Sequence, residues 1–360
     1  MSVTATEEAL GTRIEEVLRQ RFSERRAAAE RYGSEFVQLW EAAAEHALGG
    51  KLIRPRLLID LLQALTPSPL SAEETRCAID VAAHVELLHF AFLLHDDVID
   101  GDLVRRSRPN LIGALAARRP ASSGEPALHW ARSSAILLGD LLLAAAVLGF
   151  ARADTTPDAR DRLLALLDQT IFETVAGEHA DVALTDGIVA PDLRTILSTS
   201  AYKTATYSFV LPLRAAAVLA GSSPATEDRL TAIGHRLGLA YQLQDDLLSV
   251  FGDPDKHGKD AFSDLREGKE TAIIAYARMT SRWESIELHF GRSDLSATDG
   301  AHVRDGLRDC GAETFVRGLV QEHLEAVSAA LSSAESDGTL SASAAETIRA
   351  LAARVEGRSR

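Results

Sequence analysis

The chain has 360 residues, of which 46% are apolar and 25% charged, and its formal net charge is -14. Such a composition excludes a chain that is disordered throughout, and the length suffices for one large domain or two ordinary ones. The acidic balance argues against nucleic acid as a partner, so an anionic substrate requires a local basic cluster or metal ions.

The two cysteines, Cys77 and Cys310, are too few for a disulfide framework or a thiolate zinc site and suit a reducing cytoplasm. The first 22 residues are acidic and amphipathic, unlike a secretion signal. The longest apolar run, ILLGDLLLAAAVLGF at 136–150, is interrupted by Asp140. We therefore expect a soluble, cytoplasmic protein without a membrane anchor.

Apolar residues recur at helical spacing along most of the chain, and alternating strand patterns are scarce. One example is the set Ile196, Leu197, Tyr202 and Phe209. Gly, Pro, Ser and Asp clusters separate roughly ten helical segments, and none is long enough to divide two domains. The clusters lie at 65–71, 118–126, 153–159, 184–192, 220–228, 252–260 and 332–345. We predict an all-α fold in which residues 1–360 form a single large bundle of antiparallel helices.

Two segments, 71–100 and 228–250, are apolar on nearly every helical face and end in paired aspartates. Helices of this kind lie inside a bundle. Both are expected to end at a common central cavity, where divalent cations offset the cost of burying the carboxylates.

The paired aspartates have the spacing of a metal clamp. Asp96 and Asp100 are four residues apart, on one helical face, with Asp97 about 100° round the axis. Asp245 and Asp246 provide a second pair. Hard oxygen ligands suit Mg²⁺, which completes its coordination with waters and substrate phosphates. The sequence therefore predicts two or three Mg²⁺ ions that bind a diphosphate.

Basic residues are few but grouped near these motifs. Lys51 and Arg54 lie in GGKLIRPR, where the glycines and Pro55 indicate a helix start that also attracts anions. Arg105 and Arg106 follow the first aspartate motif, and Lys203 and Lys259 flank the second. His89 lies seven residues before Asp96, on nearly the same helical face.

Several ordered motifs between about residues 45 and 275 resemble the trans-type isoprenyl diphosphate synthases, also called polyprenyl synthetases. They are GGKLIRP, ELLHFAFLLHDDVIDGDLVRR, ILLGD, GEHAD, the KT at 203–204, YQLQDDLLSVFGD and DLREGKET. The C-terminal helices, 276–360, carry no such motif. The resemblance implies a homodimeric, all-α prenyltransferase. An allylic diphosphate ionises, isopentenyl diphosphate attacks the cation, and a proton is lost to the released diphosphate.

The resemblance also assigns roles by position. Asp96, Asp100 and Asp245 correspond to the metal ligands, and Asp97 and Asp246 to accessory acids. The allylic-diphosphate set is Arg105, Lys203 and Lys259, and the isopentenyl-diphosphate set is Lys51, Arg54, His89 and Arg106. Lys203, Thr204 and Gln242 correspond to the groups that face the cation. Ser249 departs from the pattern, because the family commonly has a third aspartate there.

Product length in such enzymes depends on bulk before the first aspartate motif. Small Ala91 beside Phe92 favours a medium-chain all-trans product, geranylgeranyl diphosphate over farnesyl or a longer diphosphate.

Three other functions are disfavoured. A metal phosphohydrolase of the HD type, built on His95 and Asp96, leaves the second aspartate pair and the cations unexplained. A terpene cyclase would lack the isopentenyl-diphosphate cations and would carry more aromatic residues. A non-catalytic partner subunit would have lost more of the first motif.

Overall fold

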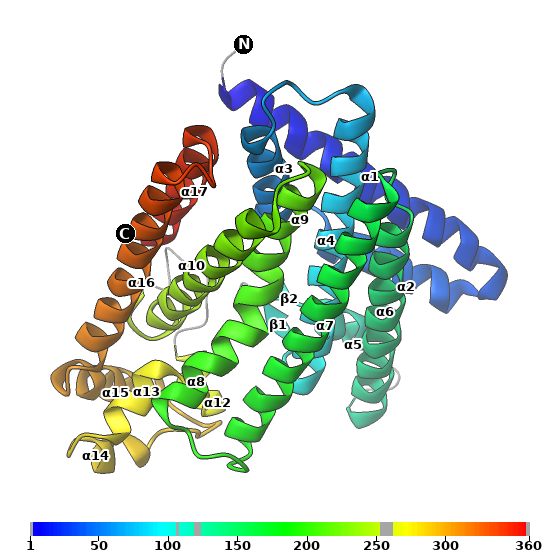
Figure 1. Cartoon of the computed structure of the whole chain (residues 1–360). Coiled ribbons are helices and arrows are strands. Elements are labelled where there is room, and N and C mark those ends of the chain that lie inside the picture. The colour runs from blue at the N-terminus through cyan, green and yellow to red at the C-terminus, as the bar shows by residue number, and fades with distance from the viewer. Residues whose placement is uncertain (1–2, 106–107, 119–123, 253–261, 358–360) are drawn as a thin grey trace. The chain divides into compact units, whose positions relative to one another are not determined.

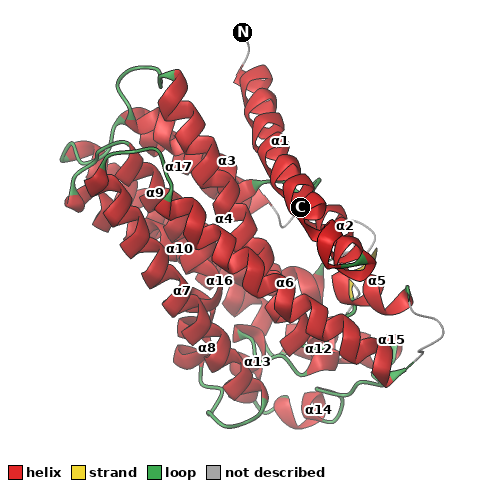
Figure 2. Cartoon of the chain, turned by 90° about the vertical axis from the view of Figure 1, so that its right-hand side faces the viewer, coloured by secondary structure: helices red, strands yellow, loops and turns green. Residues whose placement is uncertain are grey.

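The structure is a computed structural model that describes residues 3–105, 108–118, 124–252 and 262–357. It contains two compact units, Met1–Leu167 with Ala215–Ser222, and Asp168–Arg214 with Ser223–Arg360. In the described residues helices dominate, as Figures 1 and 2 show, and the strands are the two-residue pair β1 (Val104–Arg105) and β2 (Arg108–Pro109). The predicted all-α class is confirmed, while the single domain stays a prediction.

The first unit contains the N-terminal helices. They are α1 (Val3–Ala29), the 3-10 helix η1 (Glu30–Tyr32), α2 (Ser34–Ala47), α3 (Ile53–Leu65), α4 (Ala72–Ile99), α5 (Leu111–Ala117) and α6 (Glu125–Ala151). The unit also includes the start of α7 (Pro157–Thr185) and the end of α9 (Leu211–Leu219).

Helix α4 has the predicted extent, and its sequence defines both ends. At the start, the Ser71 hydroxyl accepts from the Glu74 backbone N–H while the Glu74 carboxylate accepts from the Ser71 N–H, a complete capping box. The helix then buries apolar residues on nearly every face before it ends at Ile99, with Asp100 as its C-cap residue. The prediction of an internal helix that ends in carboxylates is confirmed.

Helices α4 and α6 lie side by side because glycines on α6 make room for histidines on α4. A Cβ on Gly139 would lie 2.5 Å from Nε2 of His95. A Cβ on Gly149 would lie 2.1 Å from the His84 ring. The two glycines therefore allow close antiparallel packing over about three turns.

The second unit contains the rest of α7, the start of α9 and the C-terminal helices. These are α8 (Leu193–Ser200), the π-helix η3 (Ala201–Val210), α10 (Pro224–Phe251), α12 (Ser263–Glu267), α13 (Ala272–Arg278), α14 (Trp283–Glu287), α15 (Ala297–Asp309), α16 (Ala312–Ser336) and α17 (Ala342–Glu356). Helix α10, capped by Ser223, packs against η3 and α16 and buries apolar residues such as Leu230, Leu237 and Leu243.

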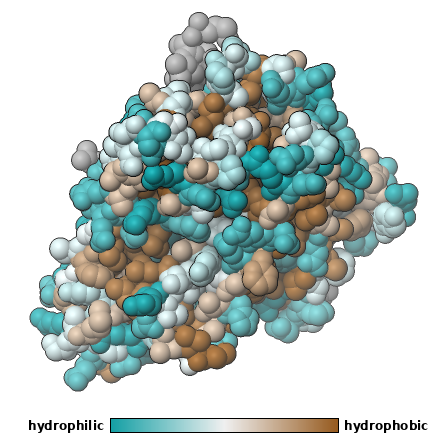
Figure 3. Space-filling view, in the orientation of Figure 1, coloured by the Kyte–Doolittle hydropathy of each residue, from teal (hydrophilic) through white to brown (hydrophobic). Residues whose placement is uncertain are grey.

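Apolar side chains also reach the surface, as the brown areas of Figure 3 show on one face of the molecule. Among the described residues, the largest such group in one element is on α6, where six large apolar side chains are exposed: Trp130, Ile136, Leu137, Leu141, Val147 and Leu148. We call this set the α6 stripe. Within the described residues, α4 and α6 are long and apolar enough to cross a membrane. The most apolar 18-residue stretch of α4 is 72% buried, whereas that of α6 is only 44% buried. Burial makes α4 a core helix, whereas α6 keeps an open apolar face.

Candidate active site

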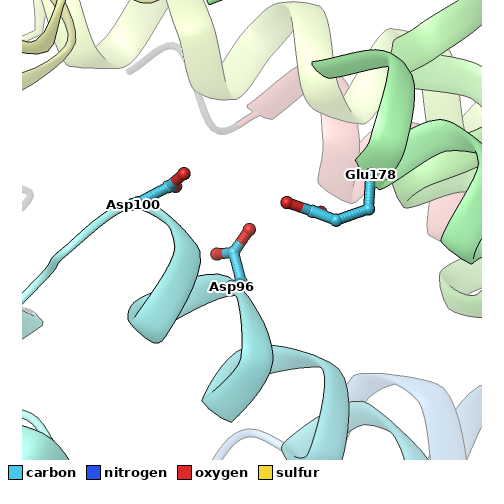
Figure 4. Close-up of side chains that lie close together, drawn as sticks. All are labelled: Asp96, Asp100 and Glu178. Atoms are coloured by element: carbon cyan, nitrogen blue, oxygen red, sulfur yellow. The ribbon is translucent and has the colours of Figure 1, made fainter. Parts of the chain in front are cut away.

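The first aspartate motif occupies the last turn of α4. Asp96 and Asp100 project from the same side of this turn, as Figure 4 shows, and carboxylate oxygens of the two residues lie within 4.8 Å of each other. Asp96 is half-buried and Asp100 exposed, so both are accessible. Two accessible carboxylates at this separation fit a hard divalent cation, as the predicted Mg²⁺ site requires.

Asp97 lies between these two residues but points into the protein. It is buried and accepts hydrogen bonds from the Arg105 guanidinium, the shortest of which is 2.7 Å. Burial raises the pKa of Asp97, and Arg105 opposes this rise. Arg105 also contacts Asp96 at 3.4 Å. The guanidinium thus holds the end of α4, and its predicted contact with substrate stays a prediction. Arg106 lies outside the described residues.

The predicted helix start is present at α3, and its anion binding stays a prediction. Leu52 adopts a left-handed conformation with φ 49°, and the helix begins at Ile53. Lys51 is exposed just before this turn, and Arg54 is half-buried in the first helical turn. A non-glycine residue with positive φ is uncommon, so the chain adopts a sharp turn that places Lys51 beside the helix N-terminus.

Accessibility along α4 divides the residues before the aspartates into two faces. Glu86, His89, Phe92 and Asp96 all retain some exposed surface and recur every three or four residues. Ala91 has 0% exposure and lies on the side that carries His84 and His95, toward α6. His89 and Phe92 therefore share the face of Asp96, whereas the Ala91 methyl group does not reach it.

The second aspartate motif is near the end of α10, in the second unit. Asp245 is half-buried, whereas Asp246 is buried and accepts a 2.8 Å hydrogen bond from the Gln242 amide. Burial raises the pKa of Asp246 to about 7, and the nearby Lys269 partly opposes the shift. The Ser249 hydroxyl donates to the backbone carbonyl of Asp245 at 3.1 Å.

The three residues expected to face the cation are divided between η3 and α10. Thr204 donates to the Gln242 side-chain carbonyl at 3.0 Å, so these two side chains do meet. Lys203 lies 2.7 Å from Asp181 and 3.0 Å from Glu178, both on α7. Figure 4 also labels Glu178. The sequence motifs did not identify Glu178 as a partner of Lys203. Glu178 precedes Asp181 by three residues on one helix, and this spacing indicates that the two carboxylates share a face. Lys259 lies outside the described residues.

The sequence pattern of the family described as Polyprenyl synthetase matches residues 37–298 of the chain. The chain belongs to this family. The resemblance inferred from the motifs is confirmed, and with it the prediction of an enzyme of the trans-isoprenyl diphosphate synthase class.

Relatives of this polyprenyl synthetase include a short chain isoprenyl diphosphate synthase of Methanocaldococcus jannaschii, 32% identical over 240 residues, or 66% of each chain. A geranylgeranyl pyrophosphate synthase of Geoglobus acetivorans is 30% identical over 290 residues, which cover 79% of this chain and 81% of that protein. The first curated relatives, the short chain isoprenyl diphosphate synthases, are matched over about two thirds of their length.

A solved structure of geranylgeranyl pyrophosphate synthase from Corynebacterium glutamicum, complexed with isoprenyl diphosphate and magnesium, has a TM-score of 0.85. It is 30% identical, and the match covers 96% of this chain and 98% of that one. The fold is therefore that of the isoprenyl diphosphate synthases.

Proposed function

We propose that this protein condenses isopentenyl diphosphate with allylic diphosphates to give geranylgeranyl diphosphate. The observation that carries the proposal is the accessible Asp96–Asp100 pair at the end of α4 in a chain of this family. Geranylgeranyl products are supported by the names of the Geoglobus and Corynebacterium proteins. Relatives named for farnesyl and geranylfarnesyl diphosphate are the alternatives.

In this proposal Asp96, Asp100 and Asp245 bind the ions, and Asp97 and Asp246 support them. Mg²⁺, when bound, neutralises the charge that develops on the departing diphosphate. Arg105, Lys203 and Lys259 bind the allylic diphosphate, and Lys51, Arg54, His89 and Arg106 bind isopentenyl diphosphate. This set of cations explains how a chain of net charge -14 takes two anionic substrates.

The chemistry makes one carbon–carbon bond for each carbon–oxygen bond broken. The allylic carbon–oxygen bond breaks and its electron pair leaves with the diphosphate, then the double bond of isopentenyl diphosphate attacks the allylic cation. A proton from the new cation passes to the released diphosphate. Thr204 donates its only hydroxyl proton to Gln242, so its oxygen lone pairs are available to stabilise positive charge.

Phe92 is the residue we propose as the main limit on product length. It shares the accessible face of α4 with Asp96, whereas Ala91 is buried toward α6. An aromatic ring one helical turn before the metal ligand narrows the path of a growing apolar tail.

We also propose that the functional unit is a homodimer formed through the α6 stripe. Exposed apolar patches of this kind on soluble proteins mark interaction sites, and a helix face is self-complementary in a two-fold dimer. The expected cytoplasmic location agrees with a protein partner for α6 instead of a membrane, and it stays a prediction.

The test is incubation of the full chain with Mg²⁺, labelled isopentenyl diphosphate and, separately, dimethylallyl, geranyl and farnesyl diphosphates. The products are then dephosphorylated and sized. A discrete twenty-carbon alcohol supports the proposal, and a shorter or longer one corrects the product. No incorporation with any primer would overturn the proposal and point to a non-catalytic subunit, with Ser249 as the first residue to examine.

A further inference from the structure

The π-helix η3 is contacted at its backbone by a glycine of α7. A Cβ on Gly177 would lie 2.3 Å from the backbone nitrogen of Lys203 and 2.7 Å from its Cα. No side chain fits in that space, because real Cβ atoms do not approach a backbone so closely. Gly177 therefore determines how closely α7 approaches Lys203. The Lys203 ammonium group contacts Asp181 and Glu178 on the same helix.

A glycine of α10 contacts the same π-helix two residues further on. A Cβ on Gly238 would lie 2.2 Å from Cβ and 2.5 Å from Cα of Ala205, the residue after Thr204. The close approach brings Thr204 Oγ1 to 3.0 Å from Gln242 Oε1. Helices α7 and α10 thus each approach η3 through a glycine.

The two contacts share a spacing that links the glycines to the polar partners. Asp181 follows Gly177 by four residues, and Gln242 follows Gly238 by four residues. Residues four apart on a helix lie on one face, one turn from each other. On each helix, the glycine is the point of backbone contact and the next turn supplies the group that binds Lys203 or Thr204.

We propose that Gly177 and Gly238 are positioning residues that fix Lys203 and Thr204 for prenyl transfer. The inference rests on the proposed function, in which Lys203 and Thr204 face substrate. A π-helix is rare and tends to occur at functional sites. Its ten residues here, Ala201–Val210, are held from two sides at the positions of these two residues.

A third glycine provides an internal comparison. A Cβ on Gly234 would lie 3.0 Å from Cα of Val210, at the other end of η3. The residue four positions after Gly234 is Gly238, which has no side chain that binds a polar group of η3. Gly234 thus contacts the same helix through packing without a polar partner one turn away.

The test uses Gly177→Ala and Gly238→Ala, with Gly234→Ala as the packing comparison and Gly318→Ala as the matched control. Gly318 is inside α16, and a Cβ there would meet nothing within 4 Å. We expect kcat for prenyl transfer to fall on the order of 10- to 100-fold in the first two variants, as for a reacting group displaced by about 1 Å. The Gly318 variant should keep the wild-type kcat.

The decisive comparison repeats Gly238→Ala in a Thr204→Val background and Gly177→Ala in a Lys203→Ala background. If each glycine acts through its neighbour, the second change costs less than about 3-fold once that neighbour is removed. A full additional loss in both backgrounds would overturn the proposal, because it would mean that the glycines act on general packing alone.

Amide hydrogen exchange at residues 201–210 gives a readout without substrate. Exchange should accelerate in Gly177→Ala and Gly238→Ala but stay unchanged in Gly318→Ala, and equal protection in all of them would contradict the inference. If Gly238→Ala does not fold, Ala205→Gly/Gly238→Ala removes the closest atom pair and serves in its place. A wild-type protein without prenyl transfer would sink the proposed function, while the exchange comparison would still decide whether the glycines hold η3.

Discussion

Asp96 and Asp97 on α4 are adjacent residues of the same type, but their environments differ. Asp96 and Asp100 lie on the accessible face, while Asp97 is 4% exposed and paired with Arg105. The helical rotation of about 100° per residue is the physical cause. Asp97 therefore stabilises the end of the helix, and its neighbours remain available to a cation.

The first prediction concerns Asp96. Asp96→Ala removes one carboxylate of the accessible pair, and we expect turnover to fall by about 10³-fold or more, because the charge on the leaving diphosphate loses its compensation. Steady-state kinetics at saturating Mg²⁺ measures the change. Asp186→Ala, in an exposed position after α7, is the control. Near-normal turnover in Asp96→Ala would remove the metal-site assignment.

The second prediction concerns product length. Phe92→Ala should lengthen the main product by one or more isoprene units, because Phe92 is on the accessible face of α4. Ala91→Phe should instead lower the thermal midpoint, because Ala91 is fully buried and a larger side chain overpacks the core. Product sizing and thermal unfolding separate the two effects. An unchanged product from Phe92→Ala would place the limit elsewhere.

The third prediction is a pH dependence of stability at His84. Burial lowers the pKa of His84 below its ordinary 6.5. As pH falls through about 6.5, the unfolded chain takes up a proton that folded His84 does not, so the free energy of unfolding decreases. The contribution is fully present above that pH.

Urea unfolding of wild type and His84→Gln at pH 7.5 and 5.5 checks this expectation. The wild type should lose more stability between the two pH values than the variant does. The other titrating groups are common to both proteins, so equal losses would show that His84 is not the source.

At the scale of the element, helix ends depend on a few side chains. Ser71→Ala breaks the capping box of α4, and we expect the free energy of unfolding to fall by about 1 kcal/mol. Denaturant unfolding measures it, with Ser332→Ala on the exposed face of α16 as the control. Equal stability of the two variants would mean that the first turn of α4 does not depend on this cap.

Apolar spacing and helix-start residues predicted the helices well, because these features act within a single helix. The apolar segment 71–100 became α4, and the Gly–Pro pattern around Lys51 became the start of α3. What could not be predicted arises between helices. The pairing of Lys203 with Glu178, and the burial of Ala91 toward α6, depend on which faces of separate helices meet, and a single helical period does not encode that.

At the scale of the whole molecule, the α6 stripe determines the expected assembly. Leu137 is 61% exposed in the stripe, so Leu137→Glu should leave the fold intact and convert a dimer to a monomer. Sedimentation velocity measures the mass. Leu288→Glu, at a position 69% exposed beside α14, is the matched control and should keep the wild-type mass. A wild-type monomer, or one that binds vesicles of neutral lipid through α6, would contradict the dimer.

The π-helix η3 affects what a change in chain length within residues 201–210 would do. Tyr202 and Phe209 are seven residues apart and would share one face of an α-helix, yet Tyr202 is 46% exposed while Phe209 is buried. An α-helical wheel therefore fails across η3, because each hydrogen-bonded turn of a π-helix contains one residue more than a turn of an α-helix. Deleting a single residue from 201–210 would therefore allow this segment to form an ordinary α-helix. The length of this segment, in addition to the identity of its residues, therefore determines its conformation.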